Sequence, residues 1–339
     1  MGNLWNIKAR YKAAMNNEIR GQRGMWLGGG TPSGSDVIDY VTITTTGDAT
    51  DFGNLTQALY EGGSCGSSTR TVHGGGKPEP AATNVIEYIV PQSTGNGADF
   101  GDLTALRARV ACFSNNIRGV WAGGSNQPAS TKTDVIDYIS IASIGNAIDF
   151  GNLSTSANYL GGCGNSTRGV IHLGGTPGAV NTLEYIQLAV LGNATDFGDL
   201  SSARVQSGCS ASNLRGLFAG GNPLGSVNTI DYITFATIGN STDFGDLSTS
   251  RGYTAGCSNN FRGVFGGGDP GPGVSNVIDY IQLDTTGDAA DFGDLSVGRT
   301  EITSASNGHG GIEVGVFARP ELGGHPDRAA FAGGFNSGD

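Results

Sequence analysis

The stretch from Asp231 to Leu247 has the sequence DYITFATIGNSTDFGDL, and the chain contains six close copies of it. The other copies begin at Asp39, Glu87, Asp137, Glu184 and Asp279. In every copy a tyrosine is followed 12 residues later by a phenylalanine, as at Tyr40/Phe52, Tyr88/Phe100, Tyr138/Phe150, Tyr185/Phe197, Tyr232/Phe244 and Tyr280/Phe292. A repeat of this regularity indicates that each copy builds one structural unit of a larger array.

A second constant feature links one copy to the next. Sixteen residues after the Asn or Asp that ends DFG[ND] stands an arginine, at Arg70, Arg118, Arg168, Arg215 and Arg262, and a double glycine soon follows, as in RGVWAGG. Length varies almost only between this double glycine and the next tyrosine phrase. A fixed framework with variable joints predicts a scaffold that carries variable loops. The loops are Thr31–Ser35, Lys77–Thr83, Ser125–Thr133, Thr176–Val180, Asn222–Val227 and Asp269–Ser275.

Each unit contains four strand-like runs and no helical periodicity. NVIDYIQL alternates apolar and polar residues, as a half-buried strand does, and GYTAGCS, RGVFGG and the DFGDL region supply three more. The links between them are rich in Gly, Asn, Asp and Ser, which favour tight turns. Four short antiparallel strands in about 48 residues predict one blade of an all-β propeller.

The order of these motifs resembles the kelch repeat. Arg118 precedes an apolar strand ending in Gly123-Gly124, Tyr138 lies in the third strand, and Phe150 follows 12 residues later, where kelch units often carry Trp. The resemblance extends over nearly the whole chain and implies a propeller of four-stranded antiparallel blades. The repeated Tyr and Phe, together with Trp26 and Trp121, are predicted to pack between blades.

The number of blades follows from how the ends are counted. The Arg-apolar-Gly-Gly motif occurs seven times if RGMWLGG at Arg23 and RAAFAGG at Arg328 are included. The prediction is therefore a single domain over 1–339 with seven blades, the last incomplete and closed by N- and C-terminal strands. Its parts are a closing segment at 1–22, six repeats at 23–299, an insertion at 300–327 and a closing strand at 328–339. Six blades followed by a C-terminal extension is the alternative.

Composition excludes several classes of partner. The net charge is −11, and a nucleic-acid surface needs a basic footprint. No apolar run of 18 residues occurs, so we expect no membrane insertion. The N-terminus lacks the apolar stretch of a secretion signal, and secretion by that route is not expected.

The chemistry-bearing residues follow the repeat. Cys65, Cys112, Cys163, Cys209 and Cys257 recur every 46 to 51 residues, which predicts small buried strand residues rather than disulfide partners. The repeated arginines, Arg118 among them, are predicted to pair with an aspartate of the DFG phrase in a neighbouring blade. Asp48, Asp51 and Asn54 have a spacing that calcium accepts, although turn formation is the favoured interpretation. No catalytic residue and no cofactor are predicted.

The exact wording IDYxTIxTxGNATDFGDL resembles repeats in tail-fibre and other structural proteins of marine bacteriophages. This resemblance implies a non-enzymatic virion structural or adhesin-type protein, assembled in the host cytoplasm and carried on the virion. Its partners would be other virion or assembly proteins and a host-surface glycan or receptor; both a monomer and a homo-oligomer remain open. The variable loops would then bind, with candidate residues Thr31, Lys77, Glu79, Asn126, Gln127, Lys132, Asn222 and Asp269.

Two other functions remain open at this stage. One is an intracellular kelch-type adaptor that binds a partner protein. The other is a propeller glycan hydrolase or lyase, which needs two carboxylates at a suitable separation. Glu313, Glu321 and Glu79 are the distinctive candidates for such a pair, because they lie outside the repeat pattern.

Overall fold

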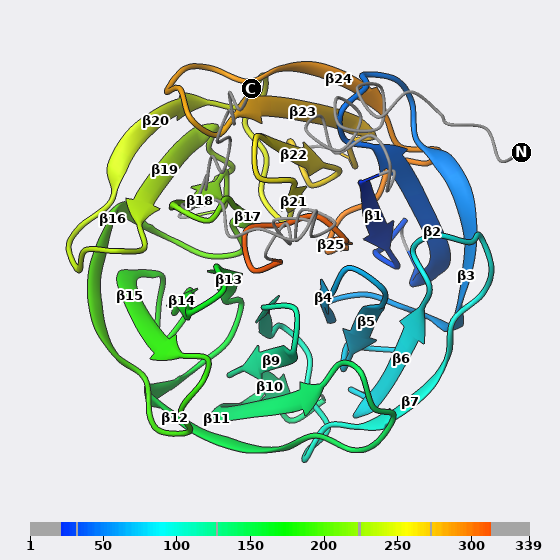
Figure 1. The fold of residues 1–339 in the computed structure, drawn as a ribbon, viewed down its shortest axis with the longest axis vertical. Helices are drawn as coiled ribbons and strands as arrows, with labels where there is room; N and C mark the ends of the chain where they lie inside the picture. The colour runs from blue at the N-terminus through cyan, green and yellow to red at the C-terminus, as the bar shows by residue number, and fades with distance from the viewer. Residues whose placement is uncertain (1–21, 32, 127, 223–224, 272, 313–339) are drawn as a thin grey trace, which may run out of the picture.

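The computed structural model describes residues 22–31, 33–126, 128–222, 225–271 and 273–312. These residues form 25 β-strands and no helix, grouped into six sheets of antiparallel strands. The sheets stand radially around a central axis as the blades of a propeller (Figure 1). The prediction of an all-β propeller with four-stranded blades is confirmed.

Each blade has the same strand order from the axis to the rim. The innermost strands of blades 1 to 6 are β25 (Thr303–Ser306), β4 (Gly63–Gly66), β8 (Ala111–Ser114), β13 (Gly161–Gly164), β17 (Gly208–Ala211) and β21 (Ala255–Ser258). The second strands are β1 (Arg23–Leu27), β5 (Thr71–Gly74), β9 (Arg118–Ala122), β14 (Arg168–His172), β18 (Arg215–Ala219) and β22 (Arg262–Gly266).

The two outer positions continue this pattern. The third strands are β2 (Ser35–Thr42), β6 (Val85–Ile89), β11 (Thr131–Ser140), β15 (Val180–Gln187), β19 (Thr229–Thr234) and β23 (Val277–Gln282). The outermost strands are β3 (Thr50–Leu59), β7 (Ala98–Asp102), β12 (Ile148–Ala157), β16 (Thr195–Arg204), β20 (Thr242–Asp246) and β24 (Ala290–Asp294). Blade 3 has one extra short strand, β10 (Ser125–Asn126), which pairs with β11.

The prediction of seven blades is wrong, and the alternative of six is correct. Blade 1 takes its innermost strand, β25, from the segment 300–327 that was expected to be an insertion, and β25 pairs with β1 through Gly24↔Ser306 and Leu27↔Thr303. The inner strands contact one another in a closed cycle that runs through β21, β25 and β4, which leaves no gap for another blade. Most of the predicted closing segment 1–22, and the whole strand predicted at 328–339, lie outside the described residues.

The DFG phrase forms the outer seam between neighbouring blades. Gly53 has a φ of 144° and a side chain there would place its Cβ 2.5 Å from the carbonyl oxygen of Gly95, in the next blade. The backbone N–H of Gly95 donates to the carbonyl of Phe52 (2.9 Å), and that of Asn54 donates to Asn96 Oδ1 (3.0 Å). Each copy thus supplies both halves of a joint that all six seams use, which explains why the wording hardly varies.

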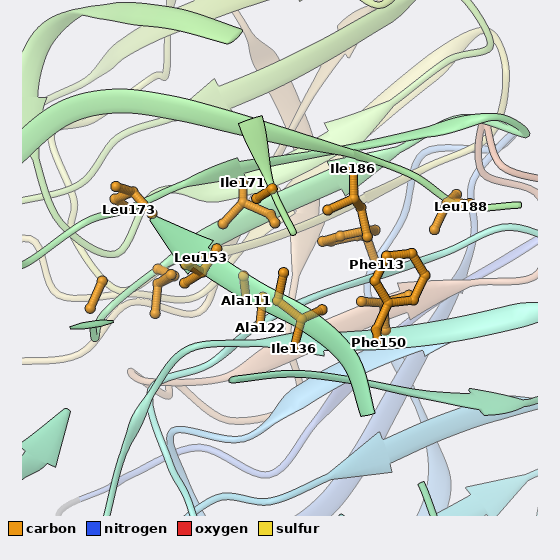
Figure 2. Close-up of a cluster of buried hydrophobic side chains, with 14 residues drawn as sticks. Ala111, Phe113, Ala122, Ile136, Phe150, Leu153, Ile171, Leu173, Ile186 and Leu188 are labelled. Carbon is orange, nitrogen blue, oxygen red and sulfur yellow. The ribbon is translucent and has the colours of Figure 1, made fainter. Parts of the chain in front are cut away.

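The interior lies between the blades rather than within any one of them. Figure 2 shows the cluster between blades 3 and 4, in which Phe113 of β8 lies beside Phe150 and Ile186. Gly169 of blade 4 accommodates Phe113, since a Cβ at that glycine would lie 1.8 Å from the ring. Every repeated tyrosine meets its phenylalanine edge to face with ring centroids 5.7 to 6.0 Å apart. Trp26 and Trp121 are fully buried, so the predicted packing role of these aromatics is confirmed.

The repeated arginines join blades, but not through the DFG aspartates as predicted. The guanidinium of Arg118 lies 4.8 Å from the ring centroid of Tyr138, and its Nη1 donates to the carbonyl of Leu188 in blade 4 (2.5 Å). The same two contacts recur at Arg23, Arg70, Arg168, Arg215 and Arg262. The prediction was wrong because β-strand periodicity turns these side chains toward the tyrosine of the adjacent strand, away from the outer seam.

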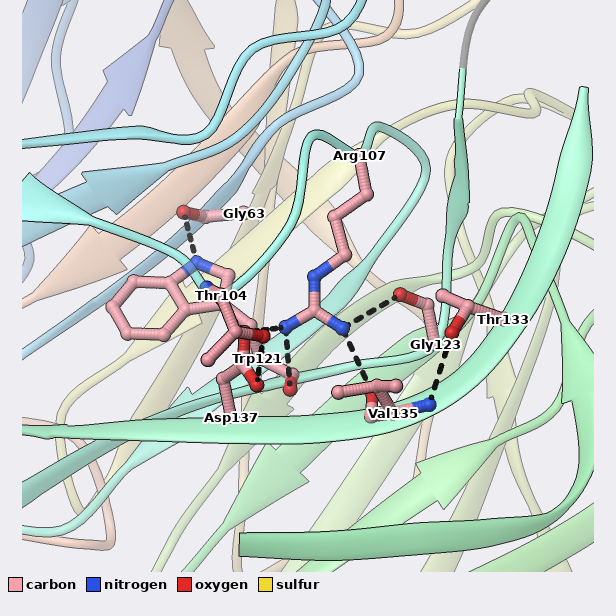
Figure 3. Close-up of polar contacts among 8 residues, drawn as sticks. All are labelled: Gly63, Thr104, Arg107, Trp121, Gly123, Thr133, Val135 and Asp137. Atoms are coloured by element: carbon pink, nitrogen blue, oxygen red, sulfur yellow. Dashed lines mark hydrogen bonds and ion pairs between the residues drawn. The ribbon is translucent and has the colours of Figure 1, made fainter. Parts of the chain in front are cut away.

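Other arginines form the buried ion pairs. Arg107 Nη2 lies 2.6 Å from Asp137 Oδ2, and its Nη1 donates to the carbonyl of Val135 (2.8 Å), as Figure 3 shows. Equivalent pairs occur at Arg204/Asp231, Arg251/Asp279 and Arg299/Asp39, with every side chain at most 1% exposed. The aspartate is the middle residue of the IDY phrase. The arginine belongs to the preceding blade, where it ends the outermost strand or follows it.

Blades 2 and 4 use a different combination at the same two positions. They carry Glu87 and Glu184 in place of the aspartate, and the blades before them, blades 1 and 3, carry Leu59 and Ala157 in place of the arginine. Glu87 and Glu184 accept from the backbone N–H groups of Thr56 (2.8 Å) and Ser154 (3.2 Å), and the aspartates of the other blades accept from the equivalent N–H groups in addition to the arginine. The two positions therefore vary together within one chain, as expected when a buried charge requires a partner.

Candidate binding face and central channel

The variable loops gather on one face of the propeller. Each joins the second strand to the third, and the start of each loop pairs with the residue that leads into an innermost strand. Such bridges are Gly30↔Thr300, Tyr60↔Lys77, Ala108↔Ser125, Asn158↔Gly175 and Gly252↔Asp269. We call this side the loop face. The loops therefore surround the mouth of the central channel.

The candidate residues of the loops lie around this mouth, and neighbouring loops touch. Lys132 Nζ donates to the carbonyl of Gly175 (3.3 Å) and Ser226 Oγ to the carbonyl of Asp269 (2.8 Å), both in the next loop. Within one loop, Lys77 Nζ is 2.8 Å from Glu79 Oε1. Thr31, Asn126 and Asn222 lie in the same set of loops. Gln127, Glu313 and Glu321 lie outside the described residues.

Sequence reasoning missed a ring of six residues at the channel mouth. One residue per blade stands just before the innermost strand, and all six have a left-handed backbone with φ between 52° and 63°. We call this set the mouth ring: Glu61, Arg109, Tyr159, Gln206, Tyr253 and Glu301. Left-handed backbone is uncommon for residues other than glycine, and six cases at one repeat position indicate a built feature.

Backbone hydrogen bonds run around the mouth ring from blade to blade. Arg109 N–H donates to the carbonyl of Glu61 (2.6 Å), Tyr159 N–H to that of Arg109 (3.0 Å), and Gln206 N–H to that of Tyr159 (3.1 Å). Two further bonds of the same kind join Tyr253 to Gln206 (3.2 Å) and Glu61 to Glu301 (3.0 Å). The ring is thus held by main-chain atoms, and its side chains are free to differ.

The side chains of the mouth ring differ although the surrounding repeat is nearly constant. Acidic, basic, aromatic and amide side chains occupy the one position, while the phenylalanine of the DFG phrase is the same in all six copies. This contrast was the signal in the sequence that could have identified the ring. Variation at a single structural position of a repeat indicates selection for chemistry rather than for packing.

The acidic side of the ring is buried and electrostatically strained. Glu61 is 5% exposed; its Oε1 accepts a hydrogen bond from Arg109 Nε (2.7 Å), and its Oε2 has no hydrogen-bond partner. Burial, reinforced by the negative charge of Glu61, raises the pKa of Glu301 to about 7. Burial also raises the pKa of Glu61, against the opposing effect of its hydrogen bond with Arg109.

The other side of the ring is aromatic. The Arg109 guanidinium lies 4.3 Å from the centroid of the Tyr159 ring, and Tyr159 and Tyr253 meet edge to face at 6.5 Å. Burial raises the pKa of Tyr159 to about 12, so its hydroxyl stays protonated at neutral pH. The Oε1 atom of Gln206 is buried and has no hydrogen-bond partner.

A channel runs below the ring and is closed at its far end. A cavity of about 120 Å³ is lined by the mouth ring, and a second of about 60 Å³ continues it along the innermost strands. Residues 307–312 close the far end: His309 Nε2 lies 2.8 Å from the Gly66 carbonyl, and Gly310 N–H donates to the carbonyl of Ala211 (3.0 Å). Within the described residues, the channel is accessible from the loop face.

The five cysteines line this channel region in two registers. All are free thiols in innermost strands, as predicted. Cys65, Cys163 and Cys257 are buried against the next blade, and Cys112 and Cys209 stand one position earlier and are partly exposed. The positions are therefore not equivalent, because a shift of one residue in a strand turns the side chain to the opposite side.

The calcium candidates take part in the outer seams. Asp48 Oδ1 accepts a hydrogen bond from the backbone of Asp294 (3.1 Å), and Asp51 lies opposite Asp39 in the register of β2 and β3. No group of three or more His, Cys, Asp or Glu side chains suited to a metal ion occurs in the described part of the chain. The Asp48 side chain thus bonds to a backbone N–H, as the turn interpretation expected, but it does so across the seam between blades rather than within its own turn.

The fold and the site define a class, a six-bladed β-propeller with a loop face around a central channel. No protein-family model matches the chain, and no curated protein matches it significantly. None of the described residues forms a helix able to cross a bilayer.

Proposed function

We propose that the protein is a non-enzymatic recognition scaffold whose loop face binds a partner, either a protein or a host-surface glycan. The observation that carries the proposal is the distribution of variation over the molecule. The seams and aromatic pairs repeat almost without change and the buried ion pair recurs at four of the six seams, whereas the loops and the mouth ring differ from blade to blade and share one face. A rigid frame that presents variable side chains on one surface is suited to specific binding.

The proposal includes a place on a phage particle, as a virion structural or adhesin-type protein. Its support is the wording of the repeat, which resembles that of marine bacteriophage structural proteins. The partners would then be other virion proteins and a surface component of the host. Mass spectrometry of purified particles tests this part: the chain at a fixed stoichiometry supports it, and its absence from particles contradicts it.

The proposal treats the acidic pair of the ring as a binding group rather than as catalytic machinery. Glycoside hydrolases place their two carboxyl groups roughly 5 to 9.5 Å apart to leave room for the sugar and water. Glu61 and Glu301 are near enough to hydrogen-bond to each other. This closeness favours binding over glycan cleavage.

Matched variants on the two faces test recognition. The loop-face variant is Lys132→Ala with Asn222→Ala, and the opposite-face control is Ser143→Ala with Asp284→Ala, all four being surface positions outside the cores. Binding would be measured on a glycan array and on immobilised host-cell envelope, with the soluble fragments released into the medium analysed for cleavage. We expect the loop-face variant to lose at least about tenfold in affinity and the control to stay within about twofold. Equal losses in both, or cleavage of a glycan by the parent chain, would contradict the proposal.

A further inference from the structure

Two acceptors of the mouth ring are buried without a lasting donor. Gln206 Oε1 has no hydrogen-bond partner, and Glu61 Oε2 has none apart from a proton that it can share with the neighbouring Glu301, although buried polar atoms usually have a partner. Arg109 Nε is bonded to the other oxygen of Glu61, Oε1, at 2.7 Å. When both carboxyl groups are ionised, a group that donates hydrogen bonds would satisfy these acceptors.

The ring also has an unbalanced negative charge. Glu61 and Glu301 are two carboxylates beside one guanidinium, that of Arg109. The next nearest cation is Lys77, whose ammonium is 2.8 Å from Glu79 and is thus already paired. Two adjacent carboxylates cannot both remain ionised in a buried site without a second cation, so one of them retains a proton until such a cation arrives.

The shape of the site limits how a cation can reach these carboxylates. The Glu61 side chain is 2% exposed and lies at the wall of the cavity of about 120 Å³ below the loops. Glycines of the innermost strands, such as Gly63 and Gly161, form part of the same wall, where they place no side chain. A cavity of this size favours a charged group on a thin, unbranched stem over one attached directly to a bulky ring.

The aromatic side of the ring offers a surface for a cation. Arg109 lies over Tyr159, and in the described part of the chain no cation lies over Tyr253. The face of a tyrosine attracts an ammonium group, most strongly where water is excluded. Acceptors, negative charge and an open aromatic face thus converge on one small opening.

We propose that the mouth ring is a receptor for a primary ammonium group on an unbranched stem, such as the end of a lysine side chain of the partner that the loop face binds. The inference rests on the proposed recognition function and makes the partner a protein. The ammonium donates to Glu61 Oε2, Glu301 and Gln206 Oε1, and it replaces the proton that the two carboxyl groups share. That proton leaves to solvent when the ammonium binds.

Isothermal titration of the full chain with small probes tests the site independently of the partner. The probes are Nα-acetyl-lysine N-methylamide, its Nε-acetylated form, which has no charge, and glucosamine, which carries an amine directly on a sugar ring. We expect saturable binding of the lysine probe at pH 8 and at least about tenfold weaker binding of the other two. Absence of lysine-probe binding at pH 8 would overturn the proposal, and tighter binding of glucosamine would reassign the site to amino sugars.

The pH dependence gives a second readout that needs no variant. The charged and titratable groups facing Glu301 are Glu61, Arg109 and Lys77, with Tyr159 and Tyr253 beside them. Because the pKa of Glu301 is about 7, its ionised fraction rises from about a tenth at pH 6 to about nine tenths at pH 8. The lysine amine remains protonated throughout, so affinity should increase about ninefold over this interval. A flat profile would contradict replacement of the shared proton.

Two matched substitutions complete the test. Glu301→Gln should weaken the lysine probe about tenfold at pH 8 and remove the pH dependence, while Asp36→Asn, at the loop-face end of β2, should change affinity by less than about twofold. Equal effects of the two changes would refute the assignment. Two combinations of results separate the ammonium site from the recognition function. If the lysine probe does not bind but the Lys132→Ala/Asn222→Ala variant loses partner binding, only the ammonium site is refuted. If the probe does not bind and this variant keeps its partner binding, recognition is refuted as well.

Discussion

Removal of Arg251 should expose the dependence of each blade on its buried ion pair. Arg251 Nη2 donates to Asp279 Oδ2 at 2.7 Å and Nη1 donates to the carbonyl of Val277 at 2.7 Å, and neither charged side chain is exposed. Arg251→Leu leaves the Asp279 carboxylate buried without its cation. Loss of one partner of a buried pair typically costs 3–5 kcal/mol, so we expect the free energy of unfolding to fall by about 4 kcal/mol.

Blade 2 of the same chain supplies the compensating change. Glu87 of blade 2 accepts from the backbone N–H of Thr56 at 2.8 Å, and Leu59 of blade 1 occupies the arginine position. The double variant Arg251→Leu/Asp279→Glu copies this combination into the seam between blades 5 and 6. We expect it to be more stable than Arg251→Leu by about 2 kcal/mol, because Glu87 and Glu184 show that a glutamate is accommodated at this position without an arginine.

The assay is urea unfolding followed by tryptophan fluorescence. Trp26 of blade 1 reports on the neighbouring blade 6, which contains Asp279, since its Nε1 donates to the carbonyl of Ala255 in that blade (3.2 Å). A double-mutant cycle with Asp279→Glu alone isolates the coupling between the two positions. If the losses from the two single changes simply add, the two positions are independent and our explanation of why they vary together is wrong.

Three further outcomes follow from the same structure. Arg118→Met should lower the free energy of unfolding by about 1–2 kcal/mol in urea titrations, less than the loss at Arg251, because a partly exposed cation–π contact and one hydrogen bond are lost; a loss above 4 kcal/mol would contradict this. Burial lowers the pKa of His73, His172 and His309 to about 4. Below pH 6.5 these histidines therefore bind protons in the unfolded chain but not in the folded chain, and each should lower the free energy of unfolding by about 2 kcal/mol at pH 5, measured by thermal melts. An unchanged melting temperature between pH 7 and pH 5 would refute that account. Gly310→Ala would place a Cβ 2.1 Å from the carbonyl oxygen of Ser212, so we expect residues 307–312 to be displaced from the far end of the channel. Cys112 should then react faster with a thiol reagent, and an unchanged rate would contradict this.

Much of the architecture could be predicted from the sequence because it depends on local patterns. Alternation in NVIDYIQL, glycine and asparagine in the links and the constant Tyr-to-Phe step all follow from strand and turn geometry. Closure could not be predicted in this way. RAAFAGG at Arg328 matches the motif of a second strand, and this match predicted a further blade. The innermost strand of blade 1 is instead TSAS at Thr303–Ser306, four small residues with little pattern of their own.

The side-chain partners of the buried arginines were harder to predict than the strands. The choice between Asp39 and Asp51 as an arginine partner depends on which side of a strand each faces across a bulge, and the register shifts between Ile38 and Asp39. The mouth ring escaped notice for a related reason. Its residues share no type, and only their common left-handed backbone shows that they belong together.

Blade 1 can be completed only late in synthesis, because its strands come from both ends of the described chain. Arg23 and Asn307, joined by a hydrogen bond, are 284 positions apart in sequence, with all the other blades between them. While the chain is being synthesised, the edge of β1 that β25 will cover has no partner, and exposed edges of this kind associate readily with strands of other molecules. Nascent chains on the same mRNA can therefore associate through this edge until β25 has left the ribosome and paired with β1.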